Sequence, residues 1–90
     1  MAFTILLHPE ANKILLGYDK LLQKRLKSEI RKLVSSPEMS NFLKGTDFRY
    51  IRIGDYRVIY EVSIEDSKII ILFIGHRNHV YSRFMNWFKK

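Results

Sequence analysis

Residues 48–62, FRYIRIGDYRVIYEV, decide how the rest of the chain is arranged. Apolar residues alternate with other residues on each side of Gly54-Asp55, which predicts two strands joined by a two-residue turn. Glycine in the first turn position favours a type II′ turn, and that turn sets Arg52 directly opposite Arg57. Like charges in this position repel each other. Either both guanidiniums splay into solvent, or they bind an anion such as a phosphate.

The length and the hydropathy bound the class of protein. Ninety residues, 47% of them hydrophobic, suffice for one domain over residues 1–90 with a single modest core. The longest apolar run, Ile69 to Ile74, has the length of a strand rather than that of a membrane helix. The N-terminus lacks the pattern of a signal peptide, so we expect a cytoplasmic protein that spans no membrane.

Charge and cysteine content narrow the chemistry. Sixteen Lys and Arg against nine Asp and Glu give a net charge of +7, which indicates a nucleic acid or an acidic protein as partner. The chain has no cysteine, which excludes disulfides, thiolate metal sites and cysteine nucleophiles. The HRNH run at residues 76–79 has no carboxylate beside it, so we expect neither a metal nor a cofactor.

Two helices are predicted before the hairpin. Pro9 suits the first position of a short helix that Gly17 closes, and Asp19 suits the N-cap of a longer one. In the longer helix an apolar stripe opposes a basic surface, which we interpret as a solvated face. The stripe contains Leu21, Leu22, Leu26, Ile30, Leu33 and Val34, and the basic surface contains Lys20, Lys24, Arg25, Lys27, Arg31 and Lys32.

The remaining elements define the fold class. Strands are predicted at about residues 2–7, 46–53, 56–63 and 68–75, with a loop at 37–46 and a terminal helix over the last fourteen residues. The order is β-α-α-β-β-β-α. It predicts an α+β fold in which the two helices of the N-terminal half pack on one face of a small antiparallel-dominated sheet.

The hairpin register places Arg52 and Arg57 on the face away from those helices. An even-length turn after residue 63 brings His76 to the same face, close to Arg57 and with Arg77 next to it. The aromatic residues Phe48, Tyr50 and Tyr81 edge this surface. Guanidiniums bind phosphate and aromatic rings stack on unpaired bases, which is the chemistry of single-stranded RNA recognition.

The run RIGDYRVIYEV, followed by IIILFIGHRNHVY, closely resembles the RelE/ParE superfamily of toxin proteins. The resemblance covers nearly the whole chain, with a G-x-Y-R-x-x-Y hairpin, a G-H-R strand end and a tyrosine four residues after that arginine. It implies a RelE-like fold. For the RelE branch it implies a ribosome-dependent endoribonuclease that cuts mRNA in the A site of the 30S subunit. In this branch the 2′-hydroxyl attacks the adjacent phosphate without a metal.

The resemblance also implies roles for individual residues. Arg57 matches the arginine that stabilises the phosphate, and Arg77 matches the arginine that helps to protonate the leaving oxygen. Tyr81 matches the tyrosine that stacks on the substrate base.

Members of the branch carry two lysines on the strand before the turn, where this chain has Arg49 and Arg52. Because arginine stays protonated in proteins, His76 becomes the candidate for part of the proton acceptor's role. The alternative is a modest reaction driven largely by positioning on the ribosome and by charge stabilisation. The expected catalytic residues are therefore Arg57, Arg77, Tyr81 and His76, and the expected substrate-binding residues are Arg49, Arg52, Tyr50 and Phe48.

The resemblance further implies a RelB-like antitoxin, encoded beside the toxin and joined to it in a hetero-oligomer. In one mode known for the family, the antitoxin displaces the terminal helix. The apolar stripe of Val80, Phe84 and Trp87 suits such a contact, although core packing is the commoner fate of an aromatic stripe.

Two other functions remain open. One is a ParE-like toxin that inhibits DNA gyrase without cleaving RNA, and the other is a basic RNA-binding module without activity. The combination of Arg57, Arg77 and Tyr81 favours the nuclease, because a gyrase inhibitor needs no such constellation.

Overall fold

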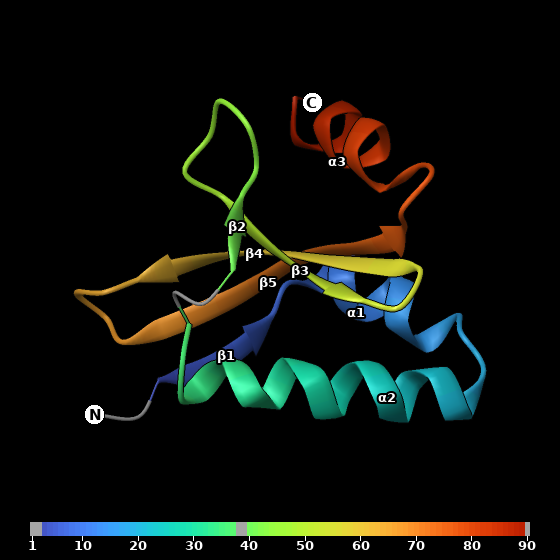
Figure 1. Ribbon diagram of the computed structural model, residues 1–90, viewed down its shortest axis with the longest axis horizontal. Coiled ribbons are helices and arrows are strands. Elements are labelled where there is room, and N and C mark those ends of the chain that lie inside the picture. Colours follow the sequence, from blue (N-terminus) through green and yellow to red (C-terminus); the bar gives the residue numbers. More distant parts are fainter. Residues whose placement is uncertain (1–2, 38–39, 90) are drawn as a thin grey trace.

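A twisted sheet forms the middle layer of the protein, with helices on both of its faces (Figure 1). The computed structural model describes residues 3–37 and 40–89, and these contain a five-stranded sheet and three α-helices. In chain order the elements are β1 (Thr4–Leu7), α1 (Pro9–Leu16), α2 (Lys20–Arg31), a 3-10 turn η1 (Lys32–Val34), β2 (Asn41–Phe42), β3 (Arg49–Ile53), β4 (Tyr56–Ser63), β5 (Lys68–His76) and α3 (Val80–Phe88).

The predicted α+β fold and the predicted order of elements are confirmed, with one addition. The strands lie in the order β1-β5-β4-β3-β2, and β1 pairs with β5 in parallel while the other pairs are antiparallel. The addition is β2, which pairs Asn41 with Tyr50 and Phe42 with Arg49 inside the segment predicted as a loop. Two residues cannot display the alternation from which a strand is predicted.

Side chains at the helix ends explain why α1 and α2 begin where they do. The Nδ1 atom of His8 accepts a hydrogen bond from the backbone N–H of Glu10 at 3.0 Å, and Pro9 follows in the first helical position. Asp19 caps α2 by accepting from the N–H of Leu22 at 2.8 Å, as predicted. Each cap satisfies a backbone donor that the helix itself leaves unpaired.

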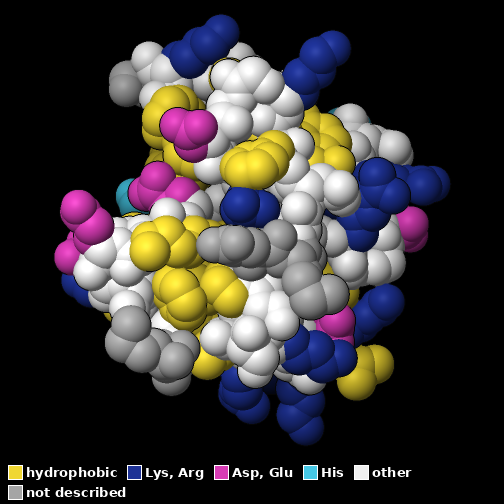
Figure 2. All heavy atoms as spheres, turned by 60° about the vertical axis from the view of Figure 1, so that its left-hand side comes forward, with side chains coloured by type: hydrophobic (Ala, Val, Ile, Leu, Met, Phe, Trp, Pro, Cys, Tyr) yellow, Lys and Arg dark blue, Asp and Glu magenta, His cyan; other side chains and the backbone are white. Residues whose placement is uncertain are grey.

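The longer helix buries most of its predicted stripe and exposes its basic surface. Leu26 and Ile30 are buried in α2, and Leu33 is buried in η1. Leu21 was expected to widen the stripe but is 80% exposed, so that part of the prediction is wrong. The predicted basic side chains are all exposed, and Lys and Arg gather along the lower edge of Figure 2, where α2 lies.

One hydrophobic core lies between α1, α2 and the sheet. Residues of β3 and β4 that were predicted to face the helices pack there, among them Ile53, Val58 and Tyr60. The hydroxyl of Tyr60 is buried in this core, donates to the carbonyl oxygen of Pro37 at 2.8 Å and also contacts the Ser40 hydroxyl. The central position of β5, between β1 and β4, agrees with its run of apolar residues.

A second core lies on the opposite face, beneath α3. Val80 and Phe84 of α3 are fully buried against Ile59 and Phe73 of the sheet. Gly75 allows this contact, because a Cβ atom there would stand 3.1 Å from the Cβ of Val80. The terminal helix is therefore packed on the face that carries Arg57.

Candidate functional site

The turn between β3 and β4 has the predicted register. Arg52 pairs with Arg57 directly across the hairpin. Gly54 has a φ of 60°, whereas Asp55 has no positive φ, which is the pattern of a type II′ turn. A Cβ atom on Gly54 would lie 2.9 Å from the guanidinium of Arg25, so α2 also packs closely against the turn.

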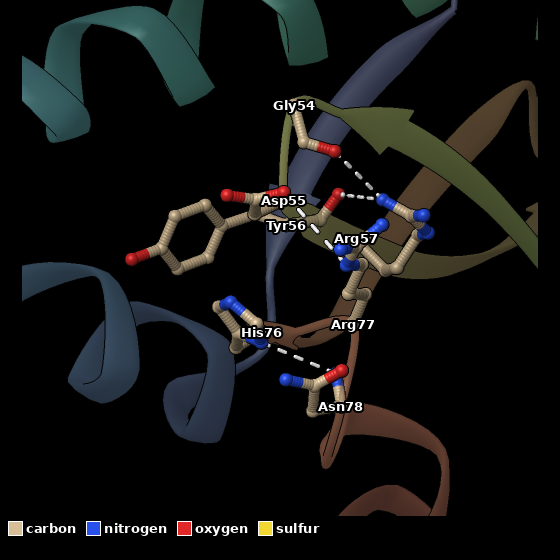
Figure 3. Close-up of polar contacts among 7 residues, drawn as sticks. All are labelled: Gly54, Asp55, Tyr56, Arg57, His76, Arg77 and Asn78. Carbon is tan, nitrogen blue, oxygen red and sulfur yellow. Dashed lines mark hydrogen bonds and ion pairs between the residues drawn. The ribbon is translucent and has the colours of Figure 1, made fainter.

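The Arg57 guanidinium folds back over its own turn. One of its terminal nitrogens, Nη1, donates to the carbonyl oxygens of Gly54 and Tyr56, each at 2.9 Å (Figure 3). The partial negative charge of these oxygens offsets the repulsion from Arg52, whose side chain is exposed. Because a guanidinium has five donors, Arg57 keeps donors for an anion while Nη1 fixes its position.

Arg77 lies beside Arg57 at the same end of the sheet. Its backbone N–H donates to the carbonyl oxygen of Asp55 at 2.7 Å, and its Nε lies 3.8 Å from the Asp55 carboxylate. The Arg77 and Asp55 side chains are 58% and 65% exposed, so this ion pair is weak and easily exchanged for another anion. Figure 3 shows the Arg57 and Arg77 side chains on one side of the hairpin.

Tyr81 completes this group from the first turn of α3. Its ring packs edge-on against Tyr50 of β3, with 5.5 Å between the centroids. Burial raises the pKa of the Tyr81 phenol, the neighbouring Tyr50 raises it further, and the Arg57 guanidinium lowers it. Since the net direction is upward, the phenol is neutral near pH 7 and offers a donor next to the guanidinium. We call Arg57, Arg77, Tyr81 and Tyr50 the arginine face.

His76 does not lie on the arginine face, and the prediction that placed it there is wrong. A β-bulge between Ile59 and Tyr60 shifts the pairing of β4 with β5 by one residue. As a result His76 pairs with Tyr56, their rings stand 5.7 Å apart, and Gly75 rather than His76 lies opposite Arg57. The bulge reverses the face to which each side chain at the end of β5 points, because neighbouring residues of a strand point to opposite faces.

The other predicted substrate-binding residues separate in the structure. Arg49 pairs with Tyr60 on the helix side of the sheet and stacks over the Phe42 ring, 4.0 Å from its centroid. Phe48 packs against Phe84 and Phe88, with centroid distances of 5.3 and 4.9 Å, so its ring serves the second core. Arg52 lies at the edge of the arginine face, beside Arg57.

The residues predicted to contact an antitoxin form the inner side of α3. Val80 and Phe84 are fully buried, and Trp87 packs 5.7 Å from Phe73 and 5.0 Å from His8. With α3 in this position, Val80 and Phe84 are covered, whereas Trp87 is partly exposed.

Asp55 contacts Arg77 from the hairpin turn and was not among the residues predicted for the site. A Gly-Asp pair is read as turn chemistry, and only the folded chain shows which side chain the carboxylate meets. Within residues 3–37 and 40–89, no three His, Asp or Glu side chains gather closely enough to hold a metal ion. None of the helices among those residues is long and apolar enough to cross a membrane.

Several solved structures share this fold. A RelE–RelB complex from Pyrococcus horikoshii OT3 contains a chain with 31% sequence identity and a TM-score of 0.74, covering 89% of this chain and 100% of that one. A free mutant of the Escherichia coli toxin RelE has 24% identity and a TM-score of 0.79, covering 97% and 98%. A RelBE toxin–antitoxin complex from Mycobacterium tuberculosis has 20% identity and a TM-score of 0.79, covering 86% and 93%.

Comparisons of sequence place the family. No curated protein matches the chain. A family model described as the ParE toxin of the type II toxin–antitoxin system parDE matches residues 5–81. This match spans most of the chain and agrees with the RelE-like fold. The chain therefore belongs to the ParE toxin family of type II toxin–antitoxin systems, within the RelE/ParE superfamily.

Proposed function

We propose that this toxin is a ribosome-dependent endoribonuclease that cleaves mRNA in the A site and thereby stops translation in the cytoplasm. The observation that carries the proposal is the arginine face. The guanidiniums of Arg57, in β4, and of Arg77, which follows β5, lie on one side of the hairpin (Figure 3), and the neutral phenol of Tyr81 stands beside Arg57. Guanidiniums bind phosphate oxygens in bidentate fashion, so this arrangement suits a phosphodiester that gains negative charge during reaction.

The proposed reaction is an internal transesterification of the RNA substrate. The 2′-oxygen of the ribose forms a bond to the adjacent phosphorus while the bond from phosphorus to the 5′-oxygen breaks. The products are a cyclic phosphate and a 5′-hydroxyl. Arg57 stabilises the charge that develops on the phosphate, and Arg77 favours protonation of the leaving 5′-oxygen. Tyr81 offers its ring to the neighbouring base.

The chain contributes charge and position rather than a strong base. Arginine stays protonated, Tyr81 holds its proton, and His76 points to the other face of the sheet. The proton of the 2′-hydroxyl therefore passes to water or to the ribosome. Positioning and charge stabilisation can supply several kcal/mol each, about 7–11 and about 2.7–4 in well-studied cases.

We also propose a RelB-like antitoxin as the partner in a toxin–antitoxin hetero-oligomer. Structural relatives from Pyrococcus horikoshii OT3 and Mycobacterium tuberculosis are described as such complexes. The net charge of +7 favours an acidic partner. Contact with Val80, Phe84 and Trp87 requires that α3 leaves the sheet, because these side chains now pack beneath it.

Translation of a defined message by purified ribosomes tests the nuclease. The toxin is added, and the RNA ends are mapped by primer extension. We expect new ends at the A-site codon with the native chain, and none with Arg57→Ala or Arg77→Ala. Arg31→Ala is the matched control, since it removes an exposed arginine of α2 away from the arginine face. Full-length message with the native toxin would contradict the proposal.

A second candidate function is inhibition of DNA gyrase. The specific observation in its favour is the match to the ParE family model. It predicts that the native toxin blocks supercoiling of relaxed plasmid by gyrase and leaves the message intact. The two candidates therefore predict opposite patterns, and the same preparation can be used in both assays.

A further inference from the structure

A cleft opens at the end of β5, where α1 on one face of the sheet and α3 on the other approach each other. It lies between α1, the end of β5 and the first turns of α3, and has a volume of about 450 Å³. The side chains that matter to its chemistry are Glu10, Tyr18, Tyr56, His76, His79 and Arg83. The proposed reaction uses none of these side chains.

Four aromatic rings follow one another along the cleft. Tyr18 and Tyr56 stand 5.3 Å apart, Tyr56 and His76 5.7 Å, and His76 and His79 6.3 Å, measured between ring centroids. His76 is half-buried and His79 exposed, so ring surface is left open to a ligand. Flat rings of this kind are the platforms on which unpaired bases stack.

The cleft offers more donors than acceptors. Nδ1 of His76 accepts from the N–H of Asn78 at 3.2 Å, which leaves Nε2 to carry the proton of the neutral ring (Figure 3). This Nε2 and the hydroxyls of Tyr18 and Tyr56 have no hydrogen-bond partner in the described part of the chain. Arg83 adds a positive charge beside Tyr18. The edge of a nucleobase, rich in acceptors, complements this set.

The cleft and the arginine face are formed by neighbouring residues at the same end of β4 and β5. Tyr56 precedes Arg57 in β4, and His76 precedes Arg77, so each pair of neighbours sends one side chain to each face. In Figure 3, His76 points toward the helices of the N-terminal half while the two arginines point away from them. A single strand that passes this end of the sheet meets both faces.

We propose that the cleft binds an unpaired base of the RNA chain, next to the phosphate that Arg57 and Arg77 hold. This rests on the proposed function and extends it, because it assigns His76 to substrate binding in place of proton transfer. The carboxylate of Glu10 lies at the cleft and opposes the binding of a polyanion there.

Binding of a fluorescein-labelled uridine hexamer, followed by anisotropy at several salt concentrations, tests the cleft. We expect His76→Ala to weaken binding by about five- to a hundredfold, without a change in salt dependence, because the lost contact is stacking. Arg57→Gln should instead lower the slope of log affinity against log salt by about 0.7, because it removes a phosphate contact.

Glu10→Gln gives a test that does not depend on damage to the fold. It removes the carboxylate at the cleft with little change of shape, and we expect binding about two- to fivefold tighter, because the half-buried Glu10 no longer repels the polyanion. Glu65→Gln, the same change in the exposed turn between β4 and β5, is the control and should bind as the native chain does.

The possible outcomes distinguish failure of the cleft proposal from failure of the nuclease proposal. Native affinity in both His76→Ala and Glu10→Gln would overturn the cleft proposal, even if the ribosome assay shows cleavage. Intact message in the ribosome assay, together with the expected pattern of affinities, would overturn the nuclease and leave the cleft as an RNA-binding site.

Discussion

Arg57 and Arg52 face each other across the hairpin, yet only Arg57 is held in place. Its Nη1 donates to two turn carbonyls at 2.9 Å, whereas Arg52 extends into solvent. A lysine cannot repeat this arrangement, because its single ammonium lacks the planar fork of donors. Of the two facing arginines, Arg57 is therefore anchored with donors left for an anion, whereas Arg52 is an exposed charge at its edge.

A second residue-scale feature is the buried hydroxyl of Tyr60, which joins β4 to the segment before β2. It donates to the carbonyl oxygen of Pro37 at 2.8 Å. Tyr60→Phe leaves that oxygen and Ser40 without this partner, and we expect a loss of about 1–3 kcal/mol in the free energy of unfolding. Urea unfolding followed by circular dichroism measures the loss. Tyr50→Phe, with its ring nearer the surface, is the control, and equal midpoints for the two variants would contradict the assignment.

Tyrosine ionisation sets the response of stability to alkaline pH. Burial raises the pKa of Tyr60, with smaller opposing effects from Ser40 and Arg49, and burial also raises the pKa of Tyr18 and Tyr81. The folded chain therefore holds these protons more tightly than the unfolded chain does. The associated stability is complete below pH 10.0, the ordinary tyrosine value, and is lost as pH rises through the folded values.

We expect the urea midpoint to fall between pH 9 and pH 11, and to fall less steeply in Tyr60→Phe. A midpoint that rises over this range would contradict the direction of these shifts.

At the scale of elements, short sequence patterns correctly predicted the features that depend on neighbouring residues. The register of β3 with β4 followed from the two-residue turn, and the helix starts followed from Asp19 and Pro9. The register of β5 did not follow, because the bulge at Ile59 and Tyr60 is a response to packing on both faces and leaves no mark on the apolar run. This shift of one residue in the pairing places His76 on the other side of the sheet.

The contact of α3 with β5 depends on Gly75, which lies against Val80, the residue before Tyr81 in α3. In Gly75→Ala the new Cβ would stand 3.1 Å from the Cβ of Val80, so the first turn of α3 must shift. We expect the shift to move Tyr81 away from Arg57 and to slow RNA cleavage at least tenfold while the chain stays folded. Gly17→Ala, at the end of α1, serves as the control, because its φ of −80° suits alanine and the new Cβ would come no closer than 3.4 Å to another atom. Equal cleavage rates for the native chain and Gly75→Ala would contradict this coupling.

At the scale of the whole molecule, the sheet separates two surfaces of different chemistry. One carries the arginine face with α3 packed beside it, the other carries α1 and the basic side of α2, and the cleft lies between α1 and α3 at the end of β5. The excess of positive charge steers a polyanion toward both surfaces, and its effect decreases with salt. The proposed cleavage site is limited to the strand end that carries Arg57, Arg77 and Tyr81.

The most direct test of the central claim is the rate of A-site cleavage in a single turnover on programmed ribosomes, with toxin in excess. Removal of one preorganised donor from a developing anion typically costs about 10²–10³ in rate. We predict a loss of that size in Arg57→Gln and in Arg77→Gln, and a native rate in Arg31→Gln. Native rates in both arginine-face variants, or the same loss in all three, would contradict the account.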